Sequence, residues 1–488
     1  ANGNITGNIT VNVLDFEETN CGLDVTNIYG ASNQTAYAPD DGGTRVSPVV
    51  NVMHISQAAG VKGNVFGGGN EALVTSNPEV NIGYYATTMS SLIPTNYPAT
   101  SSFYTTPRGY VKTNVYGGGN EAGVTGDPVI NIRDKGTVVT GIYGGCNTNG
   151  DVDGDINVNI YGGTLGTSSE AMTDGIFGGG RGHATGTNGN TTVTINKETS
   201  ESTAPEIYAD VYGGSALGEV GATDKTAKVH LIAGTVNGNV FGGGKGEGTA
   251  ASTQATVTGN TNVTIEGGTL TSKVNGYVYG GCNINGNVVG NITVDANGGT
   301  VSNDLFGGGQ GSVTTTQGNV TVTIDGGTIG NDVYGGSALG QVNNETADLT
   351  KVNLKSGTVT GNLYGGGMGD VVDHTDIWGQ VNGNVEVHVN GGTVNNVFGC
   401  NNYNEAPEGT VKVYINETTA TTMHINGNVY GGGNVAAYAG TTYVYIKKGT
   451  LTINNKVFGG GNNITAANAG VGNANVEMTG GTVLGGIY

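Results

Sequence analysis

Basic residues are scarce in this sequence. Lys and Arg number 18 against 38 Asp and Glu, which gives a net charge of −20. A nucleic-acid-binding protein carries a basic stripe that neutralises phosphates, and the sequence contains none. It also lacks any run of about eighteen apolar residues, the length needed to span a membrane as a helix. These two absences predict no nucleic-acid partner and no membrane span.

Proline is scarce as well, with 9 residues, whereas glycine is abundant, with 93 of 488. The glycines show no Gly-X-Y period, which excludes collagen. Val, Ile and Thr recur at regular places, which argues against a disordered glycine-rich linker. The chain starts at Ala1 without an initiator Met or a signal-peptide pattern, which fits a processed secreted protein and equally a trimmed sequence.

A five-residue anchor, aliphatic–aromatic–Gly–Gly–small, organises the chain. A variant occurs at Tyr29, a copy at Phe66, and the chain ends inside another at Tyr488. From Tyr116 onward, neighbouring aromatics lie 27 to 38 residues apart, a period typical of stacked-repeat proteins. The regular anchor aromatics are Tyr116, Tyr143, Phe177, Tyr212, Phe241, Tyr279, Phe306, Tyr334, Tyr364, Phe398, Tyr430 and Phe458.

The segment between two anchors predicts one coil of a parallel β-solenoid. In 319–337, an alternating apolar–polar stretch ends at Asp325-Gly326-Gly327, and a short strand and a second turn lead into the anchor. The alternation indicates a half-buried strand, and glycine permits the tight corners. We therefore expect an all-β fold of about 15 coils of roughly 30 residues, with three short strands per coil. Asparagines at turns, such as Asn239, Asn362 and Asn428, should form amide ladders between coils.

Residues 1–110 are less regular than residues 111–488 and contain six of the nine prolines. The interval from Phe66 to Tyr116 is fifty residues long, and its excess maps to an insertion near 83–108. Insertions in solenoids are loops on one face, often the binding face. The insertion carries possible ligand or glycan contacts, which a loop packed on the body would explain equally well: Tyr84, Tyr85, Tyr97 and Tyr104.

A longer period lies above the coil repeat. The residues that follow the anchors repeat in the same order from Cys146 and from Cys282, and a third cycle opens at Cys400. Four coils thus form a super-repeat, which fits gene duplication or a repeating lateral contact. Residues 2–11 resemble 285–294, and neither end of the sequence reads as a cap. Either the sequence belongs to a longer chain, or its ends stack on other copies.

The cysteines do not predict a disulfide framework. Cys146, Cys282 and Cys400 lie about four coils apart, roughly 19 Å at a strand spacing of ~4.8 Å, beyond the ~7 Å that a disulfide allows. They are either buried small apolar residues or links to a neighbouring molecule. Cys21 has no assignable partner.

Two polar clusters are candidates for chemistry, and neither has the required pattern. Asp151, Asp153 and Asp155 suggest calcium, but the glycine and glutamate of a calcium loop are absent, so solvated turn carboxylates are expected. The cluster Asp370, Asp373, His374, Asp376 and Trp378 contains one histidine and lacks convincing catalytic or metal-ligand spacing. It is interpreted as a surface loop in which Trp378 is a possible glycan contact. We predict no catalytic, metal or cofactor-binding residue.

The runs Gly-Gly-Thr-Val/Ile and Val-Tyr/Phe-Gly, as at 326–337 and 391–399, resemble the glycine-rich repeats of large bacterial surface proteins. These are adhesin-like or autotransporter-passenger-like parallel β-helices. The resemblance covers most of the chain from Asn114 and implies an extracellular or cell-surface rod. Its motifs report architecture rather than activity.

The sequence therefore predicts an extracellular structural rod without enzymatic activity, a subunit or segment of a surface filament whose partner is itself, end to end or laterally. The alternative is an adhesin that binds surface glycans. A polysaccharide-acting β-helix enzyme would need clustered carboxylates with a basic residue. An ice-binding array would need its Thr-x-Thr pairs, such as Thr192/Thr194 and Thr321/Thr323, to recur coil by coil.

Overall fold

A computed structural model of the chain defines the fold. Its contacts divide the chain into two compact units, unit 1 (Ala1–Gly238) and unit 2 (Asn239–Tyr488). The structure describes residues 7–14, 24–38, 48–53, 60–83, 109–134, 136–198, 203–248, 254–268, 270–370, 378–416, 423–447, 452–462 and 472–488.

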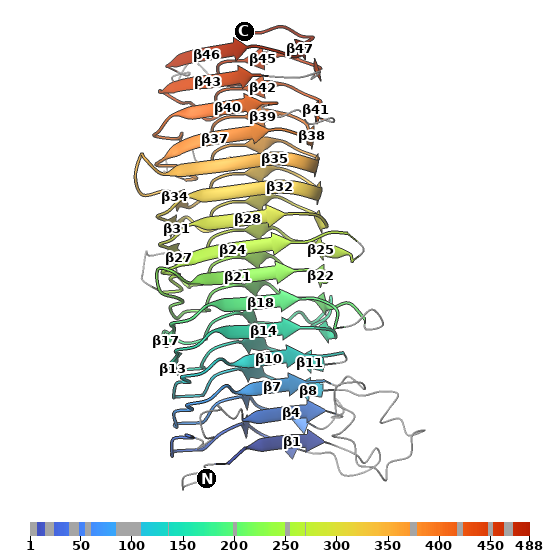
Figure 1. The fold of residues 1–488 in the computed structure, drawn as a ribbon, viewed down its shortest axis with the longest axis vertical. Coiled ribbons are helices and arrows are strands. Elements are labelled where there is room, and N and C mark those ends of the chain that lie inside the picture. The colour runs from blue at the N-terminus through green and yellow to red at the C-terminus, as the bar shows by residue number, and fades with distance from the viewer. Residues whose placement is uncertain are drawn as a thin grey trace. The chain divides into compact units, whose positions relative to one another are not determined.

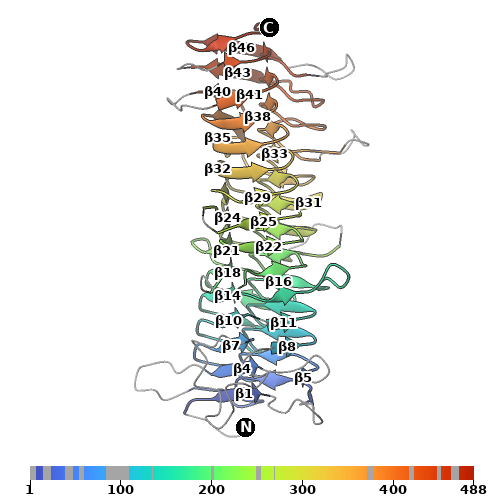
Figure 2. The same ribbon diagram turned by 90° about the vertical axis from the view of Figure 1, so that its right-hand side faces the viewer.

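Each unit is a parallel β-solenoid whose coils carry long, short and anchor strands (Figure 1). In unit 1 the long strands are β1 (Thr10–Leu14), β4 (Val49–Met53), β7 (Glu79–Ile82), β10 (Val129–Ile132), β14 (Ile156–Ile160), β18 (Thr191–Ile195) and β21 (Thr226–Leu231). Its short strands are β2 (Asp24–Val25), β5 (Gly60–Val61), β8 (Gly109–Val111), β11 (Gly136–Val138), β15 (Thr164–Leu165), β19 (Glu206–Ile207) and β22 (Gly234–Val236) (Figure 2). Its anchor strands are β3 (Ile28–Tyr29), β6 (Val65–Phe66), β9 (Asn114–Tyr116), β12 (Gly141–Tyr143), β16 (Gly175–Phe177) and β20 (Val211–Tyr212).

Unit 2 repeats the same order of strands. Its long strands are β24 (Asn260–Ile265), β28 (Ile292–Ala296), β32 (Val320–Ile329), β35 (Leu349–Val359), β37 (Asn384–Val389), β40 (Val411–Ile415), β43 (Thr441–Ile446) and β46 (Asn473–Met478). Its short strands are β25 (Ser272–Val274), β29 (Thr300–Val301), β38 (Gly392–Val394), β41 (Met423–Ile425), β44 (Thr452–Ile453) and β47 (Thr482–Val483), a role that β32 and β35 fill with their own C-terminal ends. Its anchor strands are β23 (Val240–Phe241), β26 (Val278–Tyr279), β30 (Leu305–Phe306), β33 (Val333–Tyr334), β36 (Leu363–Tyr364), β39 (Val397–Phe398), β42 (Val429–Tyr430) and β45 (Val457–Phe458).

The predicted fold class is confirmed. The chain forms about 12 turns with a spacing of about 31 residues, slightly fewer than the fifteen expected. Some coils add a fourth strand after the anchor: β13 (Asn149–Val152) and β17 (Ala184–Thr187) in unit 1, and β27 (Asn285–Val288), β31 (Val313–Thr316) and β34 (Gln341–Val342) in unit 2.

The alternating sequence of the long strands places the core. In β14, Ile156, Val158 and Ile160 are buried, whereas Asn157 and Asn159 point outward and are half-buried. Parallel pairing repeats this register from coil to coil, so that Ile130 of β10 lies beside Val158. Each unit thus has an apolar interior of stacked Val, Ile and Leu.

Glycines of the anchors lie where the chain comes closest to the next coil. A Cβ on Gly117 would collide with the carbonyl oxygen of Gly144, and a Cβ on Gly144 would collide with the carbonyl oxygen of Gly178 and with Ile156. A side chain at these places would push successive coils apart, which explains why the anchor glycines recur.

Candidate functional site

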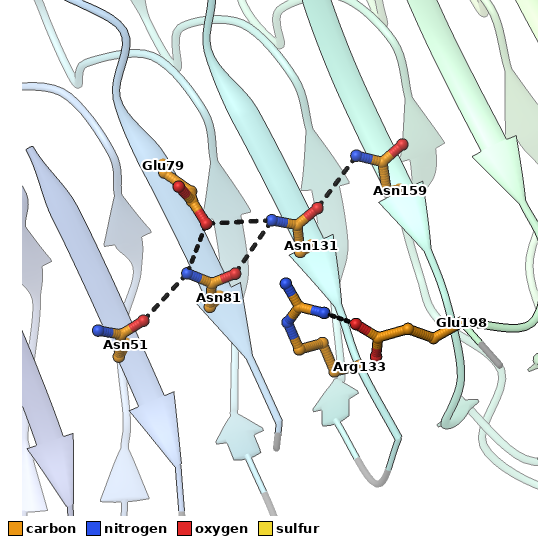
Figure 3. A network of polar contacts seen from close by, with 7 residues as sticks. All are labelled: Asn51, Glu79, Asn81, Asn131, Arg133, Asn159 and Glu198. Atoms are coloured by element: carbon orange, nitrogen blue, oxygen red, sulfur yellow. Dashed lines mark hydrogen bonds and ion pairs between the residues drawn. The ribbon is translucent and has the colours of Figure 1, made fainter. Parts of the chain in front are cut away.

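A polar network lies on the outward face of the long strands in unit 1 (Figure 3). Its centre is a column of asparagines, one from each successive coil. Asn51, Asn81 and Asn131 occupy the same register position of β4, β7 and β10, and each is only 4 to 6% exposed although it points away from the core. An asparagine this buried needs partners for its amide.

The amides supply those partners to one another. Each Nδ2 donates to the Oδ1 of the preceding coil: Asn51 to Asn12 at 2.8 Å, Asn81 to Asn51 at 3.0 Å, Asn131 to Asn81 at 3.0 Å and Asn159 to Asn131 at 3.0 Å. We call these five residues the amide column. Because Asn51, Asn81 and Asn131 each donate to one neighbouring amide and accept from the other, the column holds five coils in one register.

Glu79 extends the network sideways. Its Oε1 accepts from Nδ2 of Asn81 at 2.9 Å and from Nδ2 of Asn131 at 3.4 Å. This carboxylate therefore accepts hydrogen bonds from two neighbouring amides of the column, in addition to the bonds that the amides make to one another (Figure 3).

An ion pair between Arg133 and Glu198 lies beside the amide column. Both side chains are 13% exposed, and the Arg133 guanidinium lies 6.0 Å from the centre of the Tyr161 ring. Burial lowers the pKa of Arg133, and the nearby Glu79 opposes that shift. The pair joins the end of β10 to the segment that follows β18, and so ties non-adjacent coils together.

The network brings together the groups that an enzyme acting on polysaccharides would need, two carboxylates and a basic residue. Catalysis requires carboxylates that face a substrate across open space, whereas Glu79 is engaged by two amides and Glu198 by Arg133. The arrangement is suited to holding coils together.

Sequence reasoning missed the amide column, although a signal was present. The triplets Val-Asn-Val (50–52), Val-Asn-Ile (80–82), Ile-Asn-Ile (130–132) and Val-Asn-Ile (158–160) each place asparagine between two inward residues. Aligning the long strands by their coils would have shown the stack.

The predicted anchor aromatics form a continuous stack within each unit. The regular anchors from Tyr116 to Tyr430 are buried and Phe458 is half-buried, whereas Tyr29 is half-buried and Tyr488 is exposed. Neighbouring ring centres lie 4.6 to 5.1 Å apart in the unit 1 stack of Tyr29, Phe66, Tyr116, Tyr143, Phe177 and Tyr212. They lie 4.7 to 5.2 Å apart in the unit 2 stack of Phe241, Tyr279, Phe306, Tyr334, Tyr364, Phe398, Tyr430, Phe458 and Tyr488.

Residues just before the anchors satisfy the buried tyrosine hydroxyls. Tyr143 donates to Asp174 at 2.7 Å and Tyr334 donates to Asp332 at 3.1 Å. Burial and the adjacent carboxylates raise the pKa of both phenols. The anchors are therefore structural, with their polar ends bonded inside the solenoid.

The predicted amide ladder at turns is confirmed at Asn362, whereas Asn428 and Asn239 accept backbone N–H groups of the next coil. Nδ2 of Asn396 donates to Oδ1 of Asn362 at 2.8 Å, and Oδ1 of Asn428 accepts the backbone N–H of Lys456 at 3.0 Å. Oδ1 of Asn239 accepts the backbone N–H of Tyr277 at 2.9 Å. In unit 2 this corner ladder includes two aspartates: Asp304 accepts the backbone N–H of Asp332 at 2.9 Å.

Most of the predicted ligand contacts lie outside the described residues. These are Tyr84, Tyr85, Tyr97 and Tyr104 of the insertion. Asp373, His374 and Asp376 of the polar cluster, which was interpreted as a surface loop, also lie outside the described residues. Trp378 is half-buried, and the backbone N–H of Asp370 donates to Oδ1 of Asn404 at 2.6 Å. The glycan contacts stay predictions.

The aspartates of the possible calcium loop bond to the next coil instead. Asp153 accepts from Nδ2 of Asn188 at 2.8 Å. Asp155 accepts from the backbone N–H of Asn190 at 2.8 Å and from its Nδ2 at 3.0 Å. Within the described ranges no group of three or more His, Cys, Asp or Glu side chains has the arrangement of a metal site.

Cys146, Cys282 and Cys400 are free and buried, as expected from their separation. Each Sγ lies near a backbone carbonyl oxygen: Ala122 at 3.4 Å, Ala255 at 3.7 Å and Gly431 at 3.8 Å, respectively. Burial raises the pKa of the Cys146 and Cys282 thiols to about 12 and also raises that of Cys400. Buried protonated thiols favour the small-apolar interpretation over a link to a neighbouring molecule.

The threonine pairs do not align into an array. Thr192 and Thr194 lie beside Asn157 and Asn159 on one neighbouring strand, and beside Lys228 and His230 on the other. A flat, repeating threonine face is therefore absent around this pair.

The chain matches no protein-family model, no curated protein and no solved structure. The described residues contain no helix that is long and apolar enough to cross a membrane. The resemblance to bacterial surface repeats accordingly stays a prediction, and function has to be argued from the residues.

Proposed function

We propose that this chain is a structural β-solenoid of an extracellular filament, extended by further coils stacked end to end. The observation that carries the proposal is the repetition of the same ladders from coil to coil. Aromatic rings and corner amides each contribute one member per coil. A ladder of this kind accepts another member without a change in conformation, because every coil presents the same groups to the next.

The axial surfaces of the units support the proposal. Around β46 and β47, Met478, Leu484, Ile487 and Tyr488 are 38 to 66% exposed. A hollow of about 420 Å³ lies beside β1, β2 and β3, lined by inward residues such as Val13, Ile28 and Tyr29. A further coil, of the same or of another chain, would cover both surfaces and continue the aromatic stack.

The proposal assigns the chain no catalytic activity. Glu79 and Glu198, the carboxylates nearest to a basic residue in the polar network, are both bonded within the fold. A substrate would have to break these bonds to reach them, at the cost of stability.

Electron microscopy of the native material and of the purified chain tests the proposal. Filaments much longer than one chain are expected. Ile487→Asp/Tyr488→Asp places charge on the axial surface and should abolish them. Tyr277→Asp is the control, since Tyr277 is exposed but lies between successive coils. Separate single particles for the unaltered chain would overturn the proposal and favour a rod that binds surface glycans.

A further inference from the structure

Two long strands, β1 of unit 1 and β46 of unit 2, each pair along one edge. β1 pairs with β4, and β46 pairs with β43. In the part of the chain that the structure describes, no further long strand covers the other edge of either (Figure 1). Their outward residues are exposed: Thr10 and Asn12 on β1, and Asn475 and Glu477 on β46. An edge of this kind presents unpaired backbone groups and is able to pair with another strand.

Strand pairing fixes the place of β1 within the repeat. The successive pairings of β1, β4, β7, β10 and β14 place Thr10 at the position of Asn157 and Asn12 at the position of Asn159. Asn12 is therefore the first member of the amide column among the described residues.

The sequence of β46 places it in the same frame. β46 ends in Ala-Asn-Val-Glu-Met and β14 reads Ile-Asn-Val-Asn-Ile, and each is followed by one residue and then by Gly-Gly-Thr. Asn475 thus corresponds to Asn157, and Glu477 corresponds to Asn159. If β46 paired with β1 of a second copy in the register of the repeat, Asn475 would lie beside Thr10 and Glu477 beside Asn12.

The amide column has a direction that suits this pairing. Each Nδ2 donates to the preceding coil, as Asn51 does to Asn12 at 2.8 Å, so Nδ2 of Asn12 requires an acceptor in a coil before β1. A carboxylate serves as such an acceptor elsewhere in the column, since Glu79 accepts from Nδ2 of Asn81 at 2.9 Å. Glu477 has only acceptor oxygens when ionised and stands at the column position, so it is the complement of Asn12.

The anchor stacks match as well. Tyr488 stacks on Phe458 with ring centres 5.2 Å apart and is 66% exposed. The hollow of about 420 Å³ beside β1, β2 and β3 is lined by residues of all three strands, among them Asn12, Val25 and Tyr29. A coil that covered this hollow in register would place Tyr488 on Tyr29 and continue the aromatic stack into the next copy.

We infer that β46, β47 and Tyr488 of one copy dock head to tail on β1, β2 and β3 of a second copy. In this junction Glu477 accepts a hydrogen bond from Nδ2 of Asn12, and Tyr488 stacks on Tyr29. The inference rests on the proposed function and specifies the register in which two copies meet. Because the donor lies on β1 and the acceptor on β46, the contact is heterologous and leaves a complementary surface of each copy open for the next.

Cross-linking tests the register. Thr10→Cys and Asn475→Cys are prepared separately, both in a Cys21→Ser background, and are mixed under mild oxidation. Paired positions of neighbouring strands lie about 5 Å apart, within the Cα separation that a disulfide allows, so a covalent pair is expected. Asn473→Cys is the matched control, because Asn473 lies on the same face of β46 two residues away, and it should not cross-link to Thr10→Cys.

Charge substitutions test the contact between Asn12 and Glu477. Asn12→Asp still accepts from Asn51 but opposes Glu477 with a like charge, and should weaken association at least about tenfold in analytical ultracentrifugation. Asn12→Asp/Glu477→Lys pairs opposite charges and should restore it. Asn157→Asp, the same change between two successive coils, is the control and should associate as the unaltered chain does. Circular dichroism establishes that each variant is folded.

The outcomes separate this inference from the proposed function. Filaments that persist in Asn12→Asp, or that cross-link through Asn473→Cys as readily as through Asn475→Cys, overturn the junction and leave the filament. Specific cross-links between Thr10→Cys and Asn475→Cys in chains that never form filaments support the junction and overturn the filament. An unaltered chain that stays single overturns both.

Discussion

The outward faces of the long strands differ between the two units at equivalent places of the repeat. In unit 1 one outward register position is asparagine in β4, β7, β10 and β14. In unit 2 an outward register position is occupied by His388, Tyr414 and Tyr445 in β37, β40 and β43. Both columns stack once per coil. The amide column is held by directional hydrogen bonds, and its central residues Asn51, Asn81 and Asn131 are nearly inaccessible. The aromatic column is held by ring stacking, and its residues Tyr414 and Tyr445 are half-buried.

This difference shows that packing of the core restricts the inward residues, whereas contacts with the neighbouring coil restrict the outward residues. Inward residues are mostly Val, Ile and Leu in both units, because apolar side chains fill the space between strands. The polar exceptions are threonines whose hydroxyls donate to an oxygen inside the fold: Thr191, Thr261, Thr350 and Thr442. An outward residue needs only a favourable contact with the residue at the same position of the next coil. A hydrogen bond between amides and stacking between aromatic rings both provide such a contact. The outward columns are therefore the part of the repeat that is free to differ in function.

The largest effect is expected at the ion pair beside the amide column. Arg133→Ala leaves Glu198 as an uncompensated carboxylate at a site where both side chains are 13% exposed, and should lower the free energy of unfolding by about 3 kcal/mol. Arg133→Met/Glu198→Met removes both charges and should recover most of the loss. Urea denaturation measures both. A loss as large in the double variant would show that packing, and not the charge, is responsible.

Breaking the amide column itself should have the next largest effect. Asn81→Ala removes the donor to Asn51 and the acceptor for Asn131, both buried, at a cost of about 2 kcal/mol. Asn157→Ala, at the half-buried outward position of β14, is the control and should change stability by no more than about 0.5 kcal/mol. Hydrogen exchange of the β7 and β10 amides localises the effect. Equal protection in both variants would contradict a role for the column.

A substitution in the aromatic column should have a smaller effect. Tyr414→Asn places an amide between His388 and Tyr445, which cannot complete a ladder, and loses two ring contacts, worth about 1 kcal/mol. Tyr414→Phe keeps the stack and should retain stability. If Tyr414→Phe were as destabilising as Tyr414→Asn, the hydroxyl and not the ring would hold the column.

The smallest effect is expected at the corner residue just before the anchor, which is asparagine in some coils, such as Asn64 and Asn362, and aspartate in others, such as Asp304 and Asp332. Burial raises the pKa of both aspartates, against the hydrogen bonds that they accept. Their contribution is therefore greatest at low pH, where they are protonated, and is lost as pH rises through the folded-state pKa.

Asp332→Asn should consequently raise the melting temperature at pH 7 by about 1–2 °C, and the gain should vanish at acidic pH. Asn362→Asp, one coil later, should do the opposite. Melting curves recorded at several pH values test both. A gain from Asp332→Asn that did not depend on pH would show that the carboxylate charge is not its cause.

Much of the fold could be predicted from local pattern, because each coil repeats the same short-range signals. The anchor aromatics, the inward Val and Ile of the long strands and the separation of Cys146 from Cys282 all follow from spacing along the chain. The polar network could not be predicted in the same way. Glu79, Arg133 and Glu198 come from different coils, and their spacing along the chain does not predict that they lie close together.

The sequence by itself determined the parallel solenoid, the coil period and the aromatic anchors, since a side chain repeated every coil has to stack on its own kind. Only the tertiary structure decided which outward residues are buried, which amides pair and where the ion pair forms. The physical reason is that insertions of different length separate the coils along the chain. Register between coils is set in space by strand pairing, and the amide column exists only once that register is made.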